Sequence, residues 1–244
     1  MKKLTKISFT FALYFVASLQ VNAQNNNNNT IFGSGNVVTK TVTTQPYNNI
    51  NVAGSMEVYL EKGTEGNLTV TAEDNVQDRI VVESDGETLN ITMKNNTSLQ
   101  NTKKIKIIVP FESISGISIR GSGSVEGKDE VQNKSLALSV HGSGEITLSV
   151  ETASLNAEIS GSGNIEIKGK ATNVELSTRG SGNFEGDELI SDNAQISITG
   201  SGDSSIYLNN SLSGKIQGSG SILYGGNPTS NQVSVRGSGK VRPI

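Results

Sequence analysis

A Gly-Ser-Gly triplet that recurs along the chain is the feature that most constrains the fold. The triplet occurs eight times, and the last seven copies are separated by 21, 19, 19, 20, 18 and 19 residues. The eight copies hold 16 of the 27 glycines, so the glycine excess marks fixed points of a repeat. A repeat of this length is typical of solenoids and other stacked architectures. The triplets begin at Gly33, Gly121, Gly142, Gly161, Gly180, Gly200, Gly218 and Gly237.

Alternating apolar and polar residues flank each of the last seven triplets. Two residues before the triplet every repeat carries a β-branched residue, and four residues after its first glycine most repeats carry Val or Ile. This alternation predicts half-buried strands on both sides of the triplet. Each repeat is therefore expected to be a strand, a bend, a second strand and a connection. The β-branched column comprises Ile119, Val140, Ile159, Thr178, Ile198, Ile216 and Val235.

A unit of about 19 residues is too short to enclose a core alone but suits one coil of a solenoid. We predict an all-β fold: a single-stranded parallel β-helix, or β-solenoid, in which each strand pairs with its equivalent in the next coil. A propeller built on a double repeat and an antiparallel meander are the alternatives. Glycine accepts positive φ and close backbone approach. The predicted structural turn residues are Gly121, Gly123, Gly142, Gly144, Gly161, Gly163, Gly180, Gly182, Gly200, Gly202, Gly218, Gly220, Gly237 and Gly239.

The residue that follows the triplet is usually short and polar. Ser, Asn and Asp close turns through hydrogen bonds between their side chains and the nearby backbone. We therefore predict local bonds of this kind at each bend. The residues concerned are Ser124, Asn164, Asn183, Asp203 and Ser221.

Two regions follow from the distribution of the triplets. Residues 114–244 hold the regular repeats, whereas residues 31–113 hold a single triplet, a related Ala-Gly-Ser at Ala53, and longer alternating stretches between turn signals. We interpret residues 31–113 as an irregular β segment that caps the amino end of the solenoid, and residues 31–244 as one continuous domain. A cap is expected because exposed strand edges invite pairing with other chains.

The amino terminus predicts export. Residues 1–23 combine a basic start, an apolar run over residues 7–19 and a small-residue cleavage site, which is typical of a signal peptide. An uncleaved anchor is the alternative, but the run is short for a bilayer core of ~30 Å. Residues 24–30 include five consecutive Asn and are predicted to be a disordered tether. We expect a periplasmic, surface-exposed or secreted protein with no transmembrane segment in the mature chain.

Composition excludes several classes of chemistry. The chain has no Cys and one His, so thiolate zinc sites, iron–sulfur clusters and Cys nucleophiles are absent, and His141 is the only imidazole. The net charge is −3, and removal of three lysines with residues 1–23 makes it −6. A protein with this negative net charge lacks the basic surface that binds nucleic acid, so no nucleic-acid partner is expected. No cofactor is expected beyond weak Ca²⁺ binding, since only Glu145 and Asp203 place a carboxylate directly after a triplet.

A candidate binding surface lies just before the triplets. Polar residues fill this position in every regular repeat, and we interpret them as a stripe that hydrogen-bonds a glycan or a protein. A solvated corner without a ligand is the alternative. Tyr207 and Tyr224 are available either to stack on sugars or to pack. The candidate stripe residues are Arg120, His141, Arg179 and Arg236.

Three segments resemble a known family. Residues 49–60 (NINVAGSMEVYL), 107–110 (IIVP) and 117–125 (ISIRGSGSV) carry the resemblance, which extends over about residues 45–240. The chain resembles the exported Gram-negative proteins described as putative auto-transporter adhesin, head GIN domain. The resemblance implies an all-β, β-helical fold exposed at the cell envelope, and an adhesive role.

Two functional hypotheses follow. The first is a non-enzymatic, exported cell-envelope β-solenoid that acts as an adhesin or a recognition or scaffold module, with a glycan or protein partner. The alternative is a carbohydrate-active β-helix enzyme, a lyase or glycosidase, and a glycosidase would need two carboxylates ~5 to 9.5 Å apart. The near-constant repeat length leaves few loops to wall a catalytic groove, which favours the first hypothesis. Strand edges after Gly237 also make a homo-oligomer possible.

Overall fold

The computed structural model describes residues 29–244. The predicted signal peptide, residues 1–23, and most of the predicted tether lie outside the described residues. Asn29 and Thr30, which the sequence predicts as part of the tether, belong instead to β1 (Asn29–Phe32). This strand pairs in parallel with β8 (Thr97–Gln100), so a distant segment of the chain holds it.

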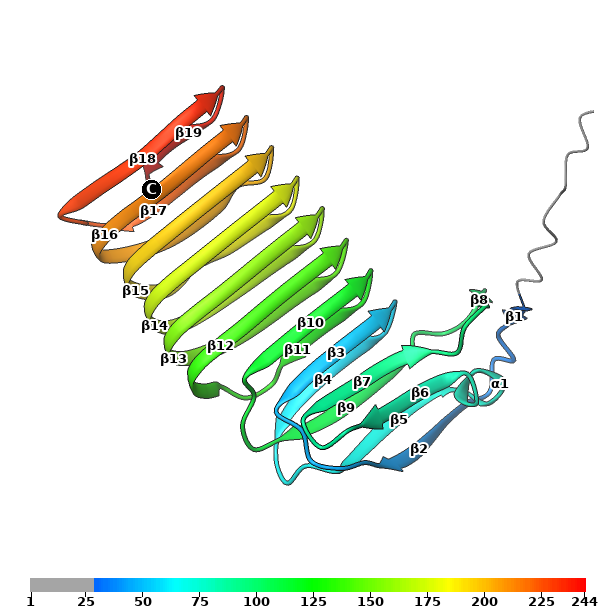
Figure 1. The fold of residues 1–244 in the computed structure, drawn as a ribbon. Coiled ribbons are helices and arrows are strands. Elements are labelled where there is room, and N and C mark those ends of the chain that lie inside the picture. Colours follow the sequence, from blue (N-terminus) through cyan, green and yellow to red (C-terminus); the bar gives the residue numbers. More distant parts are fainter. Residues whose placement is uncertain (1–28) are drawn as a thin grey trace, which may run out of the picture.

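Stacked parallel coils form most of the described chain and give it an elongated shape (Figure 1). The predicted all-β, parallel β-solenoid is confirmed, with about seven turns. From β13 to β16 each strand begins just after one triplet and runs to the first glycine of the next. The strands of the regular stack are β10 (Gly116–Gly121), β11 (Ser124–Gly127), β12 (Val131–Gly142), β13 (Glu145–Gly161), β14 (Asn164–Gly180), β15 (Asn183–Gly200), β16 (Ser204–Gly218), β17 (Ser221–Gly226), β18 (Ser230–Gly237) and β19 (Lys240–Pro243).

The register places equivalent residues of successive coils opposite one another. Gly142, for example, pairs with Gly161, and the residues before them keep step. Every second side chain therefore points inward, and the predicted β-branched column lies in the core. Val235, in the final coil, departs from this pattern and is 40% exposed. The buried members of the column are Ile119, Val140, Ile159, Thr178, Ile198 and Ile216.

The two glycines of each corner have different physical roles. Gly180 has a φ of +121°, a conformation that residues with a Cβ rarely adopt. Gly182 has no such φ, but a Cβ on it would lie 2.5 Å from Ile159 Cγ2 and closer still to the Gly163 carbonyl oxygen. The Gly161 carbonyl also accepts hydrogen bonds from the backbone N–H groups of Ser181 and Gly182, at 2.9 and 3.1 Å. The corner is therefore as tight as backbone contact allows.

The sequence predicts that the short polar residues after the triplets close local turns, but three of them, Asn164, Asn183 and Asp203, connect successive coils instead. The Asn164 side-chain oxygen accepts a hydrogen bond from the backbone N–H of Asn183 at 3.1 Å. Asn183 Oδ1 accepts from Asp203 at 2.9 Å, and Asp203 Oδ1 accepts from Ser221 at 2.7 Å. Parallel stacking at ~4.8 Å brings the equivalent N–H of the next coil within reach of each side chain. The result is a ladder of side-chain bonds along the corner.

The coil stacking continues into the segment that the sequence predicts to be irregular. β3 and β4 pair in parallel with β10 and β11, and Gly54 lies opposite Gly121. β7 and β9 stack in turn on β3 and β4. The Ala53-Gly54-Ser55 sequence is thus a true corner. The strands and helix of this region are β2 (Val37–Thr43), β3 (Asn49–Gly54), β4 (Glu57–Lys62), β5 (Asn67–Glu73), α1 (Asp74–Gln77), β6 (Ile80–Ser84), β7 (Thr88–Met93) and β9 (Lys106–Phe111).

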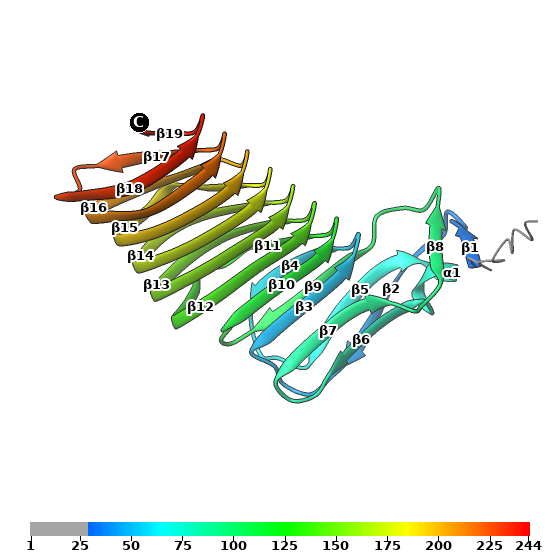
Figure 2. The same cartoon turned by 45° about the horizontal axis from the view of Figure 1, so that its top comes forward.

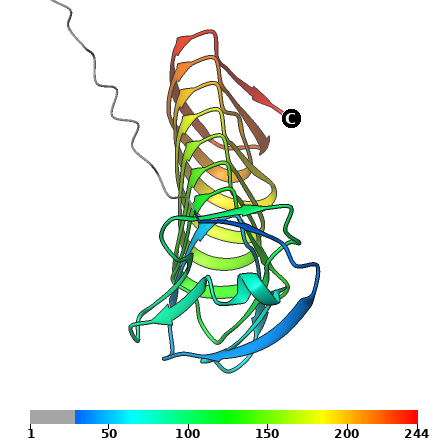
Figure 3. The same cartoon turned by 90° about the vertical axis from the view of Figure 1, so that its right-hand side faces the viewer.

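A small antiparallel cap ends the stack on the amino-terminal side, as predicted. β6 pairs antiparallel with β7, β5 with β9, and β2 with β5. Viewed along the stack, α1 and β2 cross the end of the coils (Figure 3). The first triplet belongs to this cap, where the buried Glu73 carboxylate accepts hydrogen bonds from the backbone N–H groups of Gly35 and Lys103, at 2.6 and 2.8 Å. That triplet is therefore not a coil corner.

The corner geometry predicts that Gly182→Ala destabilises the protein and that Gly63→Ala does not. Neither glycine has a positive φ. The added Cβ at Gly182 would overlap the preceding coil, whereas at Gly63 its nearest neighbour would be Pro110 Cβ at an ordinary 3.6 Å. We expect Gly182→Ala to lower the free energy of unfolding by about 1–3 kcal/mol, measured by urea titration with far-UV circular dichroism. Equal stability of the two variants would contradict the close-packed corner.

Candidate functional site

The predicted stripe residues lie in one column along the solenoid, and all four are exposed. Arg120 and His141 stand on adjacent coils in direct register. Arg179 lies two coils beyond His141, and Arg236 lies three coils beyond Arg179. With coils ~4.8 Å apart, only the first two are close neighbours. The stripe is a line of separated polar groups and does not form one compact cluster.

One stripe residue connects to a neighbouring feature. Arg179 Nη1 donates a hydrogen bond to Glu158 Oε1 at 2.8 Å, and the two groups form an ion pair. Glu158 lies in the neighbouring outward-facing column, two residues earlier in the strand than the stripe position. It lines a groove on the same outer face. Both side chains are largely exposed, so solvent weakens the pair. The pair orients the carboxylate at one end of the groove.

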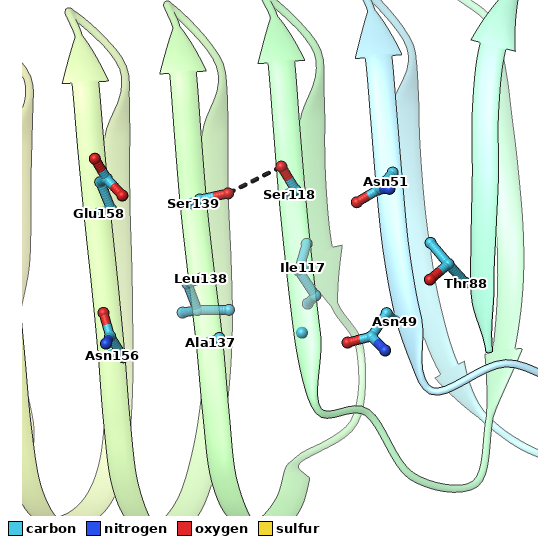
Figure 4. Close-up of a pocket in the computed structure, with 11 residues that line it drawn as sticks. Asn49, Asn51, Thr88, Ile117, Ser118, Ala137, Leu138, Ser139, Asn156 and Glu158 are labelled. Atoms are coloured by element: carbon cyan, nitrogen blue, oxygen red, sulfur yellow. Dashed lines mark hydrogen bonds between the residues drawn. The ribbon is translucent and has the colours of Figure 1, made fainter.

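The groove crosses the outer face of the sheet formed by β7, β3, β10, β12 and β13 (Figure 4). It has a volume of about 390 Å³. Two outward-facing columns line it, at three and five residues before the triplet, and Thr88 adds to its edge. The first column is Asn51, Ser118, Ser139 and Glu158, and the second is Asn49, Gly116, Ala137 and Asn156.

Small residues create the groove. Gly116 and Ala137 form the low middle of one column, between the amides of Asn49 and Asn156. A Cβ on Gly116 would lie 2.6 Å from Asn49 Oδ1, so any side chain there would displace that amide. Ile117 lies beneath, and its side chain is buried in the core. The hollow therefore has a polar rim around a low middle formed by Gly116 and Ala137.

Neighbouring side chains hold the polar groups of the groove in place. Ser139 Oγ donates to Ser118 Oγ at 2.9 Å. Asn51 Nδ2 donates to Asn90 Oδ1 at 3.1 Å, which leaves Asn51 Oδ1 available as an acceptor. Because these residues stand on a sheet, their positions are fixed by the register and not by a loop.

Two further hollows extend the polar face. One of about 130 Å³ lies beside Arg120 and is lined by Asn90 and Thr92. Another of about 290 Å³ lies farther along the stack, where Asn193 donates to Asn173 at 3.1 Å and accepts from Ser211 at 2.8 Å. Amide and hydroxyl groups therefore recur over much of this face.

The chemistry of the groove suits hydrogen bonding to a neutral polar ligand. Of the described residues that line it, Glu158 alone carries a carboxylate. Across residues 29–244 no group of three or more His, Cys, Asp or Glu side chains is arranged to hold a metal ion. The expectation from the sequence, that the protein binds no cofactor beyond weakly held Ca²⁺, stays a prediction.

The two tyrosines named in the sequence lie outside the groove. Tyr207 is 41% exposed, whereas Tyr224 is partly buried and packs against the core. The ring of Tyr207 lies beside Gly225, where a Cβ would be 2.7 Å from its Cδ2.

The stripe prediction also missed the groove itself, because Asn49, Asn51 and Thr88 come from coils without a Gly-Ser-Gly triplet.

The stacked parallel coils and corner glycines define a β-solenoid protein. The chain belongs to the family described as "Putative auto-transporter adhesin, head GIN domain", whose family model matches residues 46–228. No match was found among curated proteins. In the described part of the chain no helix is long and apolar enough to cross a membrane.

Solved structures share the fold over most of the chain. A putative adhesin from Bacteroides fragilis is 26% identical, with a TM-score of 0.83, and the match covers 88% of this chain and 100% of that one. A protein from Parabacteroides distasonis named a putative lipid binding protein is 25% identical, with a TM-score of 0.74 and coverages of 88% and 99%. A putative adhesin from the same species is 21% identical, with a TM-score of 0.70, coverages of 88% and 100%, and the same fold.

The groove predicts that a bulky residue can be added to it without loss of stability. Ala137 is exposed, so Ala137→Trp should change the free energy of unfolding by no more than about 0.5 kcal/mol. Thr147→Trp, on the outer side of β13 beyond the corner, is the matched control. Thermal melting followed by circular dichroism measures both. A large loss of stability in Ala137→Trp alone would mean that the hollow is needed for packing.

Proposed function

We propose that this protein is a non-enzymatic, exported module of the cell envelope that recognises a glycan through the polar groove on its outer face. The observation that carries the proposal is the row of amide and hydroxyl groups fixed on adjacent coils. Sugar hydroxyls both donate and accept hydrogen bonds, and so do Asn and Ser side chains. The predicted signal peptide and the family of adhesins support the proposed location.

A glycan fits this face better than a folded protein partner does. Protein interfaces gain most of their binding energy from buried aromatic, Met and Arg anchors. The residues that line the groove include no aromatic side chain, and its two large apolar residues, Ile117 and Leu138, are only 2% exposed. Polar groups around a shallow hollow favour a ligand that is itself polar.

The repeat geometry supports binding of an extended chain. The two outward-facing columns continue along the stack, and polar residues recur in them. The column that begins at Asn49 on β3, for example, includes Gln195 and Ser213 farther along the face. A polymer lying along the solenoid would contact several hollows at once. Linked contacts raise the overall affinity far above that of any one of them.

The carbohydrate-active enzyme remains the competing hypothesis. A glycosidase needs an acid and a second carboxylate facing one bond. Glu158 has no second carboxylate among the groove-lining residues, and its oxygen is engaged by Arg179. This arrangement favours binding without turnover.

A second ligand class is suggested by the relative named a putative lipid binding protein. The polar groove is unsuited to an acyl chain, because its rim is made of amides and hydroxyls. A lipid would require a different cavity on this chain.

Binding to immobilised glycans tests the proposal. We expect the protein to bind a subset of neutral or acidic bacterial envelope glycans, Ala137→Trp to weaken that binding at least tenfold, and Thr147→Trp to leave it unchanged, because only the first fills the groove. Assays for new reducing ends and unsaturated products on the same glycans should remain negative. Clear turnover would favour the enzyme, and equal binding by both variants would place the site elsewhere.

A further inference from the structure

A separate cavity lies where one coil lacks a Gly-Ser-Gly corner. β7 and β9 are the two sides of that coil, because they stack on β3 and β4. Residues 94–105 connect them, in place of a triplet, and this excursion projects from the stack with β8 and β1 (Figure 2). A cavity of about 480 Å³ lies between the excursion and the neighbouring corner at Gly54.

Met56 explains why the corner is open. In register, Met56 stands where the next coil has Gly123, the second glycine of a triplet. At regular corners that position touches the backbone of the preceding coil, as the contact from Gly182 to the Gly163 carbonyl illustrates. Met56 carries a long side chain that is 1% exposed. Its side chain takes the space that a tight corner would need, so the preceding coil swings outward.

The cavity has an apolar interior and a basic rim. Met93 and Leu99 supply the accessible apolar lining above the buried Met56 and Ile105, and three hydroxyl side chains add polar groups, those of Ser55, Thr97 and Thr102. Methionine side chains adapt easily to the shape of an apolar ligand. The wall that contains β8 rests on a two-stranded sheet, which is only marginally stable by itself.

The two rim lysines have different surroundings. Lys104 forms an ion pair with Glu57, and this hydrogen bond holds the pKa of the Glu57 carboxyl below its usual value. Lys103 is exposed, and its ammonium group has no ion-pair partner among residues 29–244. Its backbone N–H donates to the buried Glu73 at 2.8 Å, which fixes the residue at the rim. Lys103 therefore offers a positioned positive charge beside an apolar hollow.

We propose that this cavity binds a single-chain anionic amphiphile, such as a free fatty acid or a lysophospholipid with an anionic head group. The acyl chain would lie against Met93 and Leu99, and the anionic group would face the Lys103 ammonium. The volume falls within the range of small-molecule sites. Charge complementarity selects an anion, although the protein as a whole is acidic. The site rests on this cavity and not on the glycan groove, so either can fail alone.

Isothermal titration with twelve-carbon ligands below their critical micelle concentrations tests the site. Laurate and dodecyl phosphate represent the two sources of the anionic group, and dodecyltrimethylammonium is the cationic comparison. We expect both anions to bind more tightly than the cation, and decanoate to bind about tenfold more weakly than laurate because it lacks two methylenes. Unequal affinities of laurate and dodecyl phosphate would identify the preferred source.

Matched variants separate the charge from the apolar contact. Lys103→Ala should weaken laurate binding about fivefold and slightly strengthen binding of the cation, because a repulsive charge is removed, whereas Leu99→Ser should weaken both. Lys134→Ala, an exposed lysine on β12, and Ala137→Trp, in the glycan groove, should bind laurate normally. Melting curves establish that each variant is folded. Absence of laurate binding, equal affinity for anion and cation, or laurate affinity that survives either cavity substitution would overturn the proposal.

Discussion

The fold depends on backbone contact at the corners. At each regular corner the carbonyl of one triplet accepts hydrogen bonds from the next, as Gly161 does from Ser181 and Gly182. A side chain at either glycine would overlap the backbone of the preceding coil, and at the first glycine it would also strain a positive φ. Because the strands of the regular coils take their register from these corners, the columns of core and surface residues depend on them as well. The groove is one consequence, since its two columns stay aligned over successive coils.

Much of the fold could be predicted because equivalent residues of a parallel stack recur at a nearly constant spacing in the sequence. The spacing of the triplets and the β-branched residue two positions before them were enough to place Val140 and Ile159 in the core and to give the coil its length. The amino-terminal coils were harder to recognise. Their corner at Gly54 carries Met56 in place of a second glycine, and the coil of β7 and β9 has no triplet at all. Their parallel pairing connects segments that are far apart in the chain, and a local sequence pattern cannot predict such pairing.

The candidate site was predicted only in part, for the same reason. Arg120 and His141 could be assigned to one exposed column because both precede a triplet. The groove beside them needs Asn49 and Thr88, which belong to coils outside the regular repeat, and a glycine at position 116 that makes room for Asn49. Alternation predicts which residues face outward, but not where small residues leave a hollow. The apolar cavity could not be predicted from the repeat, because it lies beside the coil of β7 and β9, which has no Gly-Ser-Gly triplet.

The order of the coils in space differs from their order in the chain, and this has a consequence for how the protein is assembled. The coil of β3 and β4 lies between that of β7 and β9 on one side and that of β10 and β11 on the other, and both neighbours come later in the sequence. The first coil in the chain is therefore an internal coil of the stack, and later coils lie on both sides of it. The cap side is finished by residues up to 111, whereas the other side adds repeats one by one, each needing only the coil before it. The chain beyond β12 thus extends the stack at one end only, and its repeats rest on the coil of β3 and β4 through β10 and β11.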